Sequence, residues 1–239
     1  MPSALLSTRP EGERDPLVPR LRGLGWRVHA VPTAIAEPLV FDPPDLGRFD
    51  WVVVTSAAGV RALLDAGLPG AAARWAAVGP RTAAELAERG VAAAAVPEQS
   101  RGVRIAEAIA ALTPLAGLRV LLARADAAAG DLPDALREAG ALVEDLAVYH
   151  TAIGPESSRA GVAAALADPA LAAAVFASGS AVRGLLRLGG AAARRVPAVT
   201  IGPATSAVAR AEGLSVVAEA GRPGVEDLVA AISVWDRQI

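Results

Sequence analysis

Two stretches of the chain, WVVVTSAAGVRALLDAG (residues 51–67) and AAVFASGSAVRGLLRLG (residues 173–189), resemble each other at a constant offset that pairs Ser56 with Ser178. In both stretches an apolar run leads into a small polar turn and then into an amphipathic segment. This is the pattern of a buried strand followed by a helix. The repeat therefore indicates two copies of one strand–helix unit.

Two more pairs of segments repeat in the same way. They are AAVGPRTAAELAERG (76–90) with VTIGPATSAVARAEG (199–213), and LLSTRPEGERDPLVPRLRGLGWRV (5–28) with VLLARADAAAGDLPDALREAGALV (120–143). The apolar runs are continuous rather than alternating, which favours parallel strands covered by helices on both faces. Runs of this kind predict about ten strands that alternate with helices. The predicted fold class is α/β, with two parallel sheets.

The order of the repeated pieces predicts how the two units are connected. Two sequential domains would give this order, and so would an insertion. In the insertion, residues 1–32 and 152–239 form a discontinuous domain, and residues 38–148 form an inserted domain. Two extended connectors, 33–37 and 149–151, favour the insertion as a connecting ladder or hinge. A cleft between two open sheets is a usual ligand position in this class.

Composition excludes several kinds of chemistry. The 239 residues are 53% hydrophobic and include no cysteine, which excludes disulfides and thiolate catalysis. All 23 basic residues are arginine, so Schiff-base chemistry and a P-loop lysine are excluded. With only two histidines we expect no metal site. A net charge of −2 argues against nucleic-acid binding. No apolar run reaches about 18 residues, so we expect no membrane partner and a cytoplasmic location.

Four turns follow strands and open helices, which makes their backbone donors candidates for binding anions. They are Thr55-Ser56, Gly79-Pro80-Arg81-Thr82, Ser178-Gly179-Ser180 and Gly202-Pro203-Ala204-Thr205. Free N–H groups and the helix dipole attract carboxylates there, and hydroxyls add donors. Plain helix capping is the better explanation for Ser or Thr at any single turn, whereas four such turns on two domains favour anion binding. The segment from Thr82 to Glu85 also predicts a capping box, with Gly90 ending that helix.

Arg9 and Arg124 occupy equivalent positions after equivalent strands. Both are expected at the carboxyl edges of the sheets, where a guanidinium can clamp a carboxylate through two parallel hydrogen bonds. The alternative is a surface ion pair, with Glu11 for the first or Asp126 for the second.

Segments along nearly the whole chain resemble the uroporphyrinogen-III synthase family. They are LLSTRP, VVVTSAAGVRALL, AVGPRTAAELAERG, RVLLARA, AVYHT, AVFASGSAV, TIGPATSAVARAEG and GVEDLVAAI, in this order. The resemblance implies two flavodoxin-like (Rossmann-like) domains joined by a two-strand linker, with the middle domain inserted into the other. The chain departs from the family at Ala58, where Asn is frequent, and at Ala177, where Thr is common.

The resemblance also implies a reaction. A cyclising hydro-lyase of tetrapyrrole biosynthesis, the route to porphyrins and heme, would close the linear tetrapyrrole hydroxymethylbilane to uroporphyrinogen III. Water is lost and the last pyrrole ring is inverted through a spiro intermediate. No cofactor is implied, and we expect a monomer. The alternative is a noncatalytic two-domain binding protein for a small anionic ligand, because a cleft with anion-binding turns would look the same.

Tyr149, the only tyrosine, ends the strand LVEDLAVY. With the resemblance, it is the candidate catalytic residue, because a phenol there can hydrogen-bond the departing hydroxyl as a general acid or orienting group. The alternative is a packed strand residue with a solvated hydroxyl. For substrate binding the match points first to Thr82 and Thr205, and then to Ser56 and Ser178. The turn residues Thr55, Ser180, Gly79 and Gly202 and the two arginines, Arg9 and Arg124, complete the candidate site.

Overall fold

The computed structural model describes residues 3–67, 73–97, 102–128 and 130–237. Two compact units divide the chain. Unit 1 combines Met1–Ile35 with Ala152–Ile239, and unit 2 is the continuous stretch Ala36–Thr151. Within the described residues, no helix is both long enough and apolar enough to cross a membrane.

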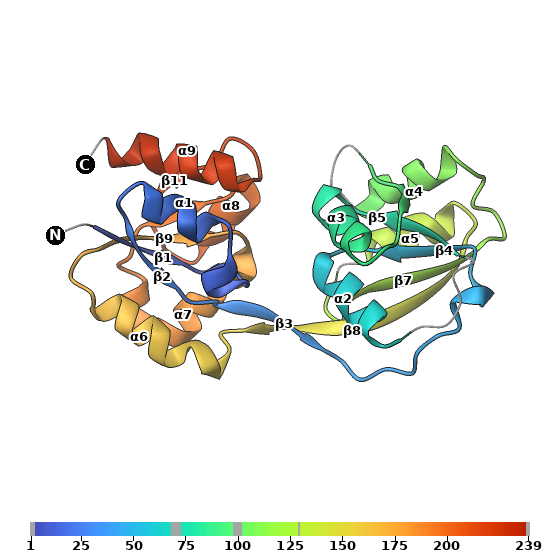
Figure 1. Cartoon of the computed structure of the whole chain (residues 1–239), viewed down its shortest axis with the longest axis horizontal. Helices are drawn as coiled ribbons and strands as arrows, with labels where there is room; N and C mark the ends of the chain where they lie inside the picture. The colour runs from blue at the N-terminus through green and yellow to red at the C-terminus, as the bar shows by residue number, and fades with distance from the viewer. Residues whose placement is uncertain (1–2, 68–72, 98–101, 129, 238–239) are drawn as a thin grey trace. The chain divides into compact units, whose positions relative to one another are not determined.

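The sheet of unit 1 has five strands in the order β11-β10-β9-β1-β2 (Figure 1). These strands are β1 (Ala4–Ser7), β2 (Arg27–Ala30), β9 (Leu171–Phe176), β10 (Ala198–Thr200) and β11 (Val216–Glu219). β1 pairs in parallel with both β2 and β9. The first strand thus lies in one sheet with strands from the C-terminal part of the chain, which confirms the inserted rather than the sequential arrangement.

Helices cover both faces of this sheet. They are α1 (Leu17–Gly23), α6 (Arg159–Ala167), α7 (Gly179–Ala193), α8 (Pro203–Ala211) and α9 (Val225–Asp236), with short 3-10 turns η1 (Gly12–Arg14) and η3 (Glu156–Ser158). On one face, α6, α7 and α8 pack on Leu6 and Phe176. On the other face, α1 and α9 pack on Leu5 and Val175. Figure 1 shows α6 and α7 on the opposite side of the strands from α1 and α9.

Unit 2 repeats this plan with one additional strand, in the order β3-β8-β7-β4-β5-β6. Its strands are β3 (Ala34–Pro38), β4 (Trp51–Val54), β5 (Arg74–Ala77), β6 (Ala93–Ala95), β7 (Arg119–Ala125) and β8 (Leu142–Ile153). Its helices are α2 (Ala57–Asp65), α3 (Pro80–Glu88), α4 (Gly102–Ala110) and α5 (Asp131–Glu138), with the 3-10 turn η2 (Leu46–Arg48). The chain passes between the units within β3 and within β8, which are neighbours in this sheet.

Burial on both faces explains why β4 is apolar throughout. Val52 and Val54 face the core under α2 and α3, whereas Trp51 and Val53 face the core under α4 and α5. All four side chains are buried. Full burial of an aliphatic side chain contributes about 1.5–3 kcal/mol, so this strand stabilises both layers at once. The two sheets and their inserted arrangement confirm the predicted fold class.

A close backbone contact fixes the start of β3 on unit 1. Thr33 donates its hydroxyl to the carbonyl of Ala181 in α7 at 2.7 Å. The amide of Gly154 donates to the carbonyl of Thr33 at 2.9 Å. Gly184 makes the approach possible, because a Cβ at that position would lie 1.7 Å from the Thr33 carbonyl oxygen. Any side chain there would force the connecting strand off the helix.

An acidic residue ties the edge strand β2 to the segment before β9. Asp168 accepts hydrogen bonds from Arg27 at 2.8 Å and from the amide of Ala170 at 3.0 Å, and its carboxylate lies 2.8 Å from His29 Nε2. The His29 contact first, and then the Ala170 amide and Arg27, lower the pKa of Asp168 from 3.8 to about 2. These contacts favour the ionised carboxylate in the folded state.

The lowered pKa of Asp168 predicts an acid-dependent loss of stability. A carboxyl group whose pKa falls on folding stabilises the protein at any pH above its pKa in the unfolded state. This stabilisation disappears as the pH falls through its pKa in the folded state. Above pH 3.8 the urea midpoint of unfolding should therefore be higher for wild type than for Asp168→Asn. The difference between the two midpoints should shrink as the pH falls to about 2. A difference that does not change across this range would contradict the assignment.

Candidate functional site

The carboxyl ends of the central strands form equivalent edges in the two units. In unit 1 the neighbouring strands β1 and β9 are followed by helices on opposite faces of the sheet. In unit 2 the same is true of the neighbouring strands β7 and β4. In parallel α/β sheets the loops at such a switch of direction commonly bind ligands. The predicted site residues on the loops after β4 and β9 lie at these edges.

Tyr149 is held by a short chain of hydrogen bonds in unit 2. It lies on β8, partly buried, with its ring packed against the core under α2. Ser56 donates its hydroxyl to the phenol oxygen of Tyr149 at 3.0 Å. The amide of Gly59 in turn donates to Ser56 Oγ at 3.0 Å. Because the phenol oxygen accepts from Ser56, the phenol's own proton stays available for another acceptor.

The local sequence explains this geometry. Ser56 is the N-cap of α2, with the extended backbone (φ −156°, ψ 158°) that a capping residue adopts. A Cβ on Gly59 would lie 3.4 Å from Ser56 Oγ and 3.7 Å from Tyr149 Cε1. These are ordinary contact distances, so a methyl group would fit at this position, and Gly59 takes part through its backbone amide. Sequence reasoning missed Gly59, because only the pairing of β4, β7 and β8 brings it to the tyrosine.

The equivalent turn of unit 1 has the same form. Ser178 is the N-cap of α7, with φ −161° and ψ 158°, and accepts a hydrogen bond from the amide of Ala181 at 3.1 Å. Ser180 follows in the first turn of α7 and is partly buried, as is Thr55 in the turn of unit 2. The structure thus places Ser56 and Ser178 in matching positions, each capping a helix that begins at the carboxyl end of a strand.

The remaining two turns differ from the prediction in detail. Gly79 and Gly202 are the N-caps of α3 and α8, and each is followed by proline at the first helical position. Thr82 and Thr205 therefore lie inside the first turns of these helices, and both are buried. The predicted capping box at Thr82 is wrong, because proline already starts the helix two residues earlier.

Gly90 ends α3 as predicted, with φ +77° and its amide bonded to the carbonyl of Ala87. Glu85, the other half of the predicted capping box, instead pairs with Arg61 at 2.7 Å and with Arg89 at 3.4 Å. Its carboxylate therefore links α3 to α2 and does not reach back to the N-terminus of its own helix.

Arg9 and Arg124 have partners other than those expected. Arg9 is buried, and its Nε donates to the buried carboxylate of Asp15 at 2.5 Å. Arg124 lies within β7 rather than after it, and its Nε and a terminal nitrogen reach Asp145 at 2.8 and 2.5 Å. The Asp145 hydrogen bond raises the pKa of Arg124. Each arginine thus pairs with an aspartate other than the example that we expected, with Asp15 for Arg9 and Asp145 for Arg124.

Asp126 binds His150 instead. The ring nitrogen Nδ1 lies 2.9 Å from the carboxylate, and this contact lowers the pKa of Asp126. The amide of Asp126 also donates to the carbonyl of Tyr149 at 3.1 Å. The loop after β7 is thus attached to β8 at the tyrosine backbone and at the residue that follows it, which fixes the backbone that carries the phenol.

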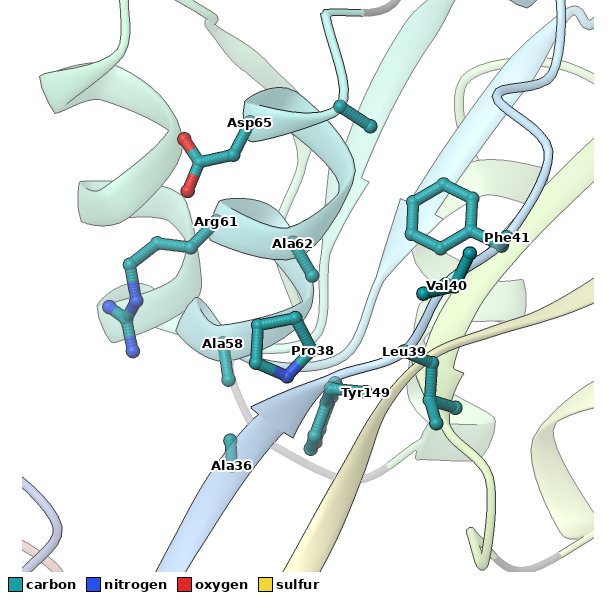
Figure 2. A pocket seen from close by; sticks show the side chains of 11 residues that line it. Ala36, Pro38, Leu39, Val40, Phe41, Ala58, Arg61, Ala62, Asp65 and Tyr149 are labelled. Carbon is teal, nitrogen blue, oxygen red and sulfur yellow. The ribbon is translucent and has the colours of Figure 1, made fainter.

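A pocket of about 400 Å³ opens beside Tyr149 within unit 2. Its walls come from the end of β3 and the segment that follows it, from α2 and from the tyrosine itself, as Figure 2 shows. Ala58 and Ala62 on α2 face Pro38, with Phe41 farther along the same segment. Sequence reasoning did not identify these residues, because a Pro-rich connector and two alanines carry no chemical signal of their own.

Comparisons with known proteins agree with one another. The sequence profile of the family described as uroporphyrinogen-III synthase HemD matches residues 15–230. A uroporphyrinogen-III synthase from Synechococcus elongatus is 28% identical over 256 aligned residues, which cover 98% of this chain and 96% of the relative.

Two solved structures share the fold along the full length. A mutant uroporphyrinogen III synthase from Thermus thermophilus has a TM-score of 0.63 at 20% identity, covering 99% of this chain and 100% of that one. Uroporphyrinogen-III synthetase from Helicobacter pylori has a TM-score of 0.67 at 18% identity, covering 98% and 100%. With the profile spanning most of its length, the chain belongs to the uroporphyrinogen-III synthase family.

Proposed function

We propose that the chain acts as a cyclising hydro-lyase that converts hydroxymethylbilane to uroporphyrinogen III, with Tyr149 as the group that assists loss of water. The observation that carries the role of Tyr149 is the hydrogen bond from Ser56 to its phenol oxygen, at 3.0 Å. Family membership supports an enzyme that acts on a tetrapyrrole and does not favour the noncatalytic binder.

The hydrogen bonds from Gly59 to Ser56 and from Ser56 to Tyr149 suit a tyrosine that acts as a general acid. The amide of Gly59 polarises the Ser56 hydroxyl, which donates to the phenol oxygen and leaves the phenol's own proton free to be donated to the substrate. The phenol protonates the hydroxymethyl oxygen, the C–O bond breaks and water leaves, while the pyrrole nitrogen supplies the electron pair that the carbon loses. The last ring then attacks that carbon through its own substituted α-position, which forms the spiro intermediate. The bond from this α-position to the neighbouring bridge carbon breaks, and the bridge carbon bonds instead to the free α-position of the same ring, so that the ring is inverted. The proton lost from that free position returns to the tyrosinate, and Ser56 stabilises the anion in the interval.

The helix N-termini suit the substrate's acetate and propionate arms. Ser56 and Gly79 cap helices in unit 2, and Ser178 and Gly202 cap helices in unit 1. The first N–H groups of a helix have no partner within the helix, and the dipole favours negative charge there. We propose that these turns hold the flexible substrate so that the last ring reaches the reacting carbon. We propose that the protein acts as a monomer and without a cofactor.

Product analysis tests the proposed function directly. Wild-type protein incubated with hydroxymethylbilane should yield the type III isomer, because ring inversion requires control of the substrate's conformation. Uncatalysed closure joins the last ring without inversion and gives the type I isomer. Type I product alone, at the uncatalysed rate, would overturn the proposal and revive the noncatalytic binder.

Distributed recognition predicts a small effect of any single hydroxyl. Ser178→Ala should weaken binding of uroporphyrinogen III by about 0.5–1.5 kcal/mol, since one hydrogen bond among many is lost. Titration calorimetry measures this difference, and circular dichroism checks that α7 survives loss of its cap. A loss of more than about 3 kcal/mol with the fold intact would mean that this one hydroxyl dominates binding.

A further inference from the structure

The pocket beside Tyr149 is not explained by the binding of carboxylates. Its inner lining is apolar and includes Pro38, Phe41, Ala58, Ala62 and the tyrosine ring. Its volume of about 400 Å³ falls within the range of small-molecule pockets. Such a pocket takes a flat apolar group rather than an anion.

Charge at the rim of the pocket is already balanced. Arg61 pairs with Glu85 at 2.7 Å, and Asp65 pairs with Arg89 at 2.5 Å. In Figure 2 the side chains of Arg61 and Asp65 extend away from Pro38. Because each charge has a partner of opposite sign, the rim offers no excess positive charge to an acetate or propionate arm. The arms must find donors elsewhere, and the helix N-termini supply them.

An exposed apolar side chain borders the pocket. Val40 has a relative exposure of 104%, although it lies next to the partly buried Phe41 and lines the same pocket. A ligand in the pocket would cover this side chain, and removal of apolar surface from water would favour binding. The small side chains of Ala58 and Ala62, one turn apart on α2, keep the space open.

We infer that this ring pocket, formed by Pro38, Val40, Phe41, Ala58 and Ala62 with the ring of Tyr149, holds the pyrrole ring that carries the leaving hydroxyl. The inference rests on the proposed function. The same tyrosine forms a wall of the ring pocket and ends the hydrogen-bond chain, so a ring seated there has its hydroxymethyl group beside the phenol. Ala58 and Ala62 set the size of ring and arms that can enter.

Filling the ring pocket tests the inference. Ala62→Leu should raise KM for hydroxymethylbilane about tenfold or more, because the added carbons occupy the space of the ring. The product should also contain more type I isomer, since a displaced ring closes without control. Ala84→Leu is the matched control: it makes the same change on the exposed face of α3, away from the pocket, and should keep wild-type kinetics.

A second variant covers the case in which Ala62→Leu does not fold. Val40→Ser changes a fully exposed side chain and should raise KM about threefold to tenfold by removing apolar contact. A wild-type KM in either folded variant overturns the inference that the ring pocket holds the pyrrole ring. In that case type III product from wild type still leaves the proposed function standing, whereas type I product alone overturns the proposed function itself.

Discussion

Tyr149→Phe should lower kcat about 100-fold and leave product binding nearly unchanged. Hydroxide is a poor leaving group at neutral pH, and a positioned general acid typically contributes about 100-fold to 10,000-fold. The pyrrole nitrogen pushes electrons toward the departing oxygen, so the lower end of that range applies. Steady-state kinetics with hydroxymethylbilane measures the loss. The phenylalanine ring keeps the packing of tyrosine against the core under α2.

Stability is the control for this experiment. Loss of the phenol removes the hydrogen bond from Ser56, which should cost the fold about 1 kcal/mol. Melting near the wild-type temperature therefore shows that any loss of turnover is chemical. Ser56→Ala keeps the phenol but removes its donor, and should lower kcat about tenfold through loss of support for the tyrosinate. Unchanged kcat in Tyr149→Phe would remove the tyrosine from the mechanism and leave it as a packed strand residue.

Asp15→Asn should lower the free energy of unfolding by about 3–5 kcal/mol. Asp15 and Arg9 are both buried and paired at 2.5 Å, and the second oxygen of Asp15 accepts from the amide of Leu17 at 2.8 Å. Breaking a buried ion pair by removing one partner leaves an uncompensated charge in the interior. Asparagine can keep the hydrogen bond from the Leu17 amide. The lost free energy of unfolding therefore reports the cost of leaving the charge of Arg9 unpaired. Urea denaturation of the full chain measures it.

The double variant Arg9→Met/Asp15→Asn separates the ion pair from local packing. Removing both charges should recover most of the lost stability, because no buried charge is then unpaired. Equal losses in the single and double variants would show that packing, and not charge, explains the effect. Arg9 in this position orders the loop after β1 rather than presenting a free guanidinium to solvent.

Much of the fold could be predicted from the sequence because the repeat and the apolar runs are strong local signals. The strand at residues 51–54 is apolar on both sides, and the structure buries both sides. The order of the pieces allowed both a sequential and an inserted arrangement, and the two extended connectors favoured the insertion. The helix start near Thr82 was misplaced because the capping pattern and the proline pattern overlap there, and the proline fixes the backbone angle.

The site could be predicted only in part. Tyr149 stands out as the single tyrosine, but its donor Ser56 lies 93 positions away and becomes its neighbour only through the strand order. The partner of Arg9 was missed because Glu11 is closer in sequence, whereas the chain turns so that Asp15 meets the guanidinium. The ring pocket left no signal, since alanines contribute to it by the space they leave.

The position of β1 between β2 and β9 has a consequence for synthesis on the ribosome. Thr8, just after β1, donates its hydroxyl to Val175, 167 positions later in the chain. Unit 2 is one continuous stretch between them and can fold as soon as it has emerged. β1 must wait for its second partner strand β9, and Leu6 stays uncovered until α6, α7 and α8 are made, whereas α1 can cover Leu5 earlier. Chaperones that shield apolar segments would act on β1, which is made before unit 2 and completes its sheet only after unit 2 has been made.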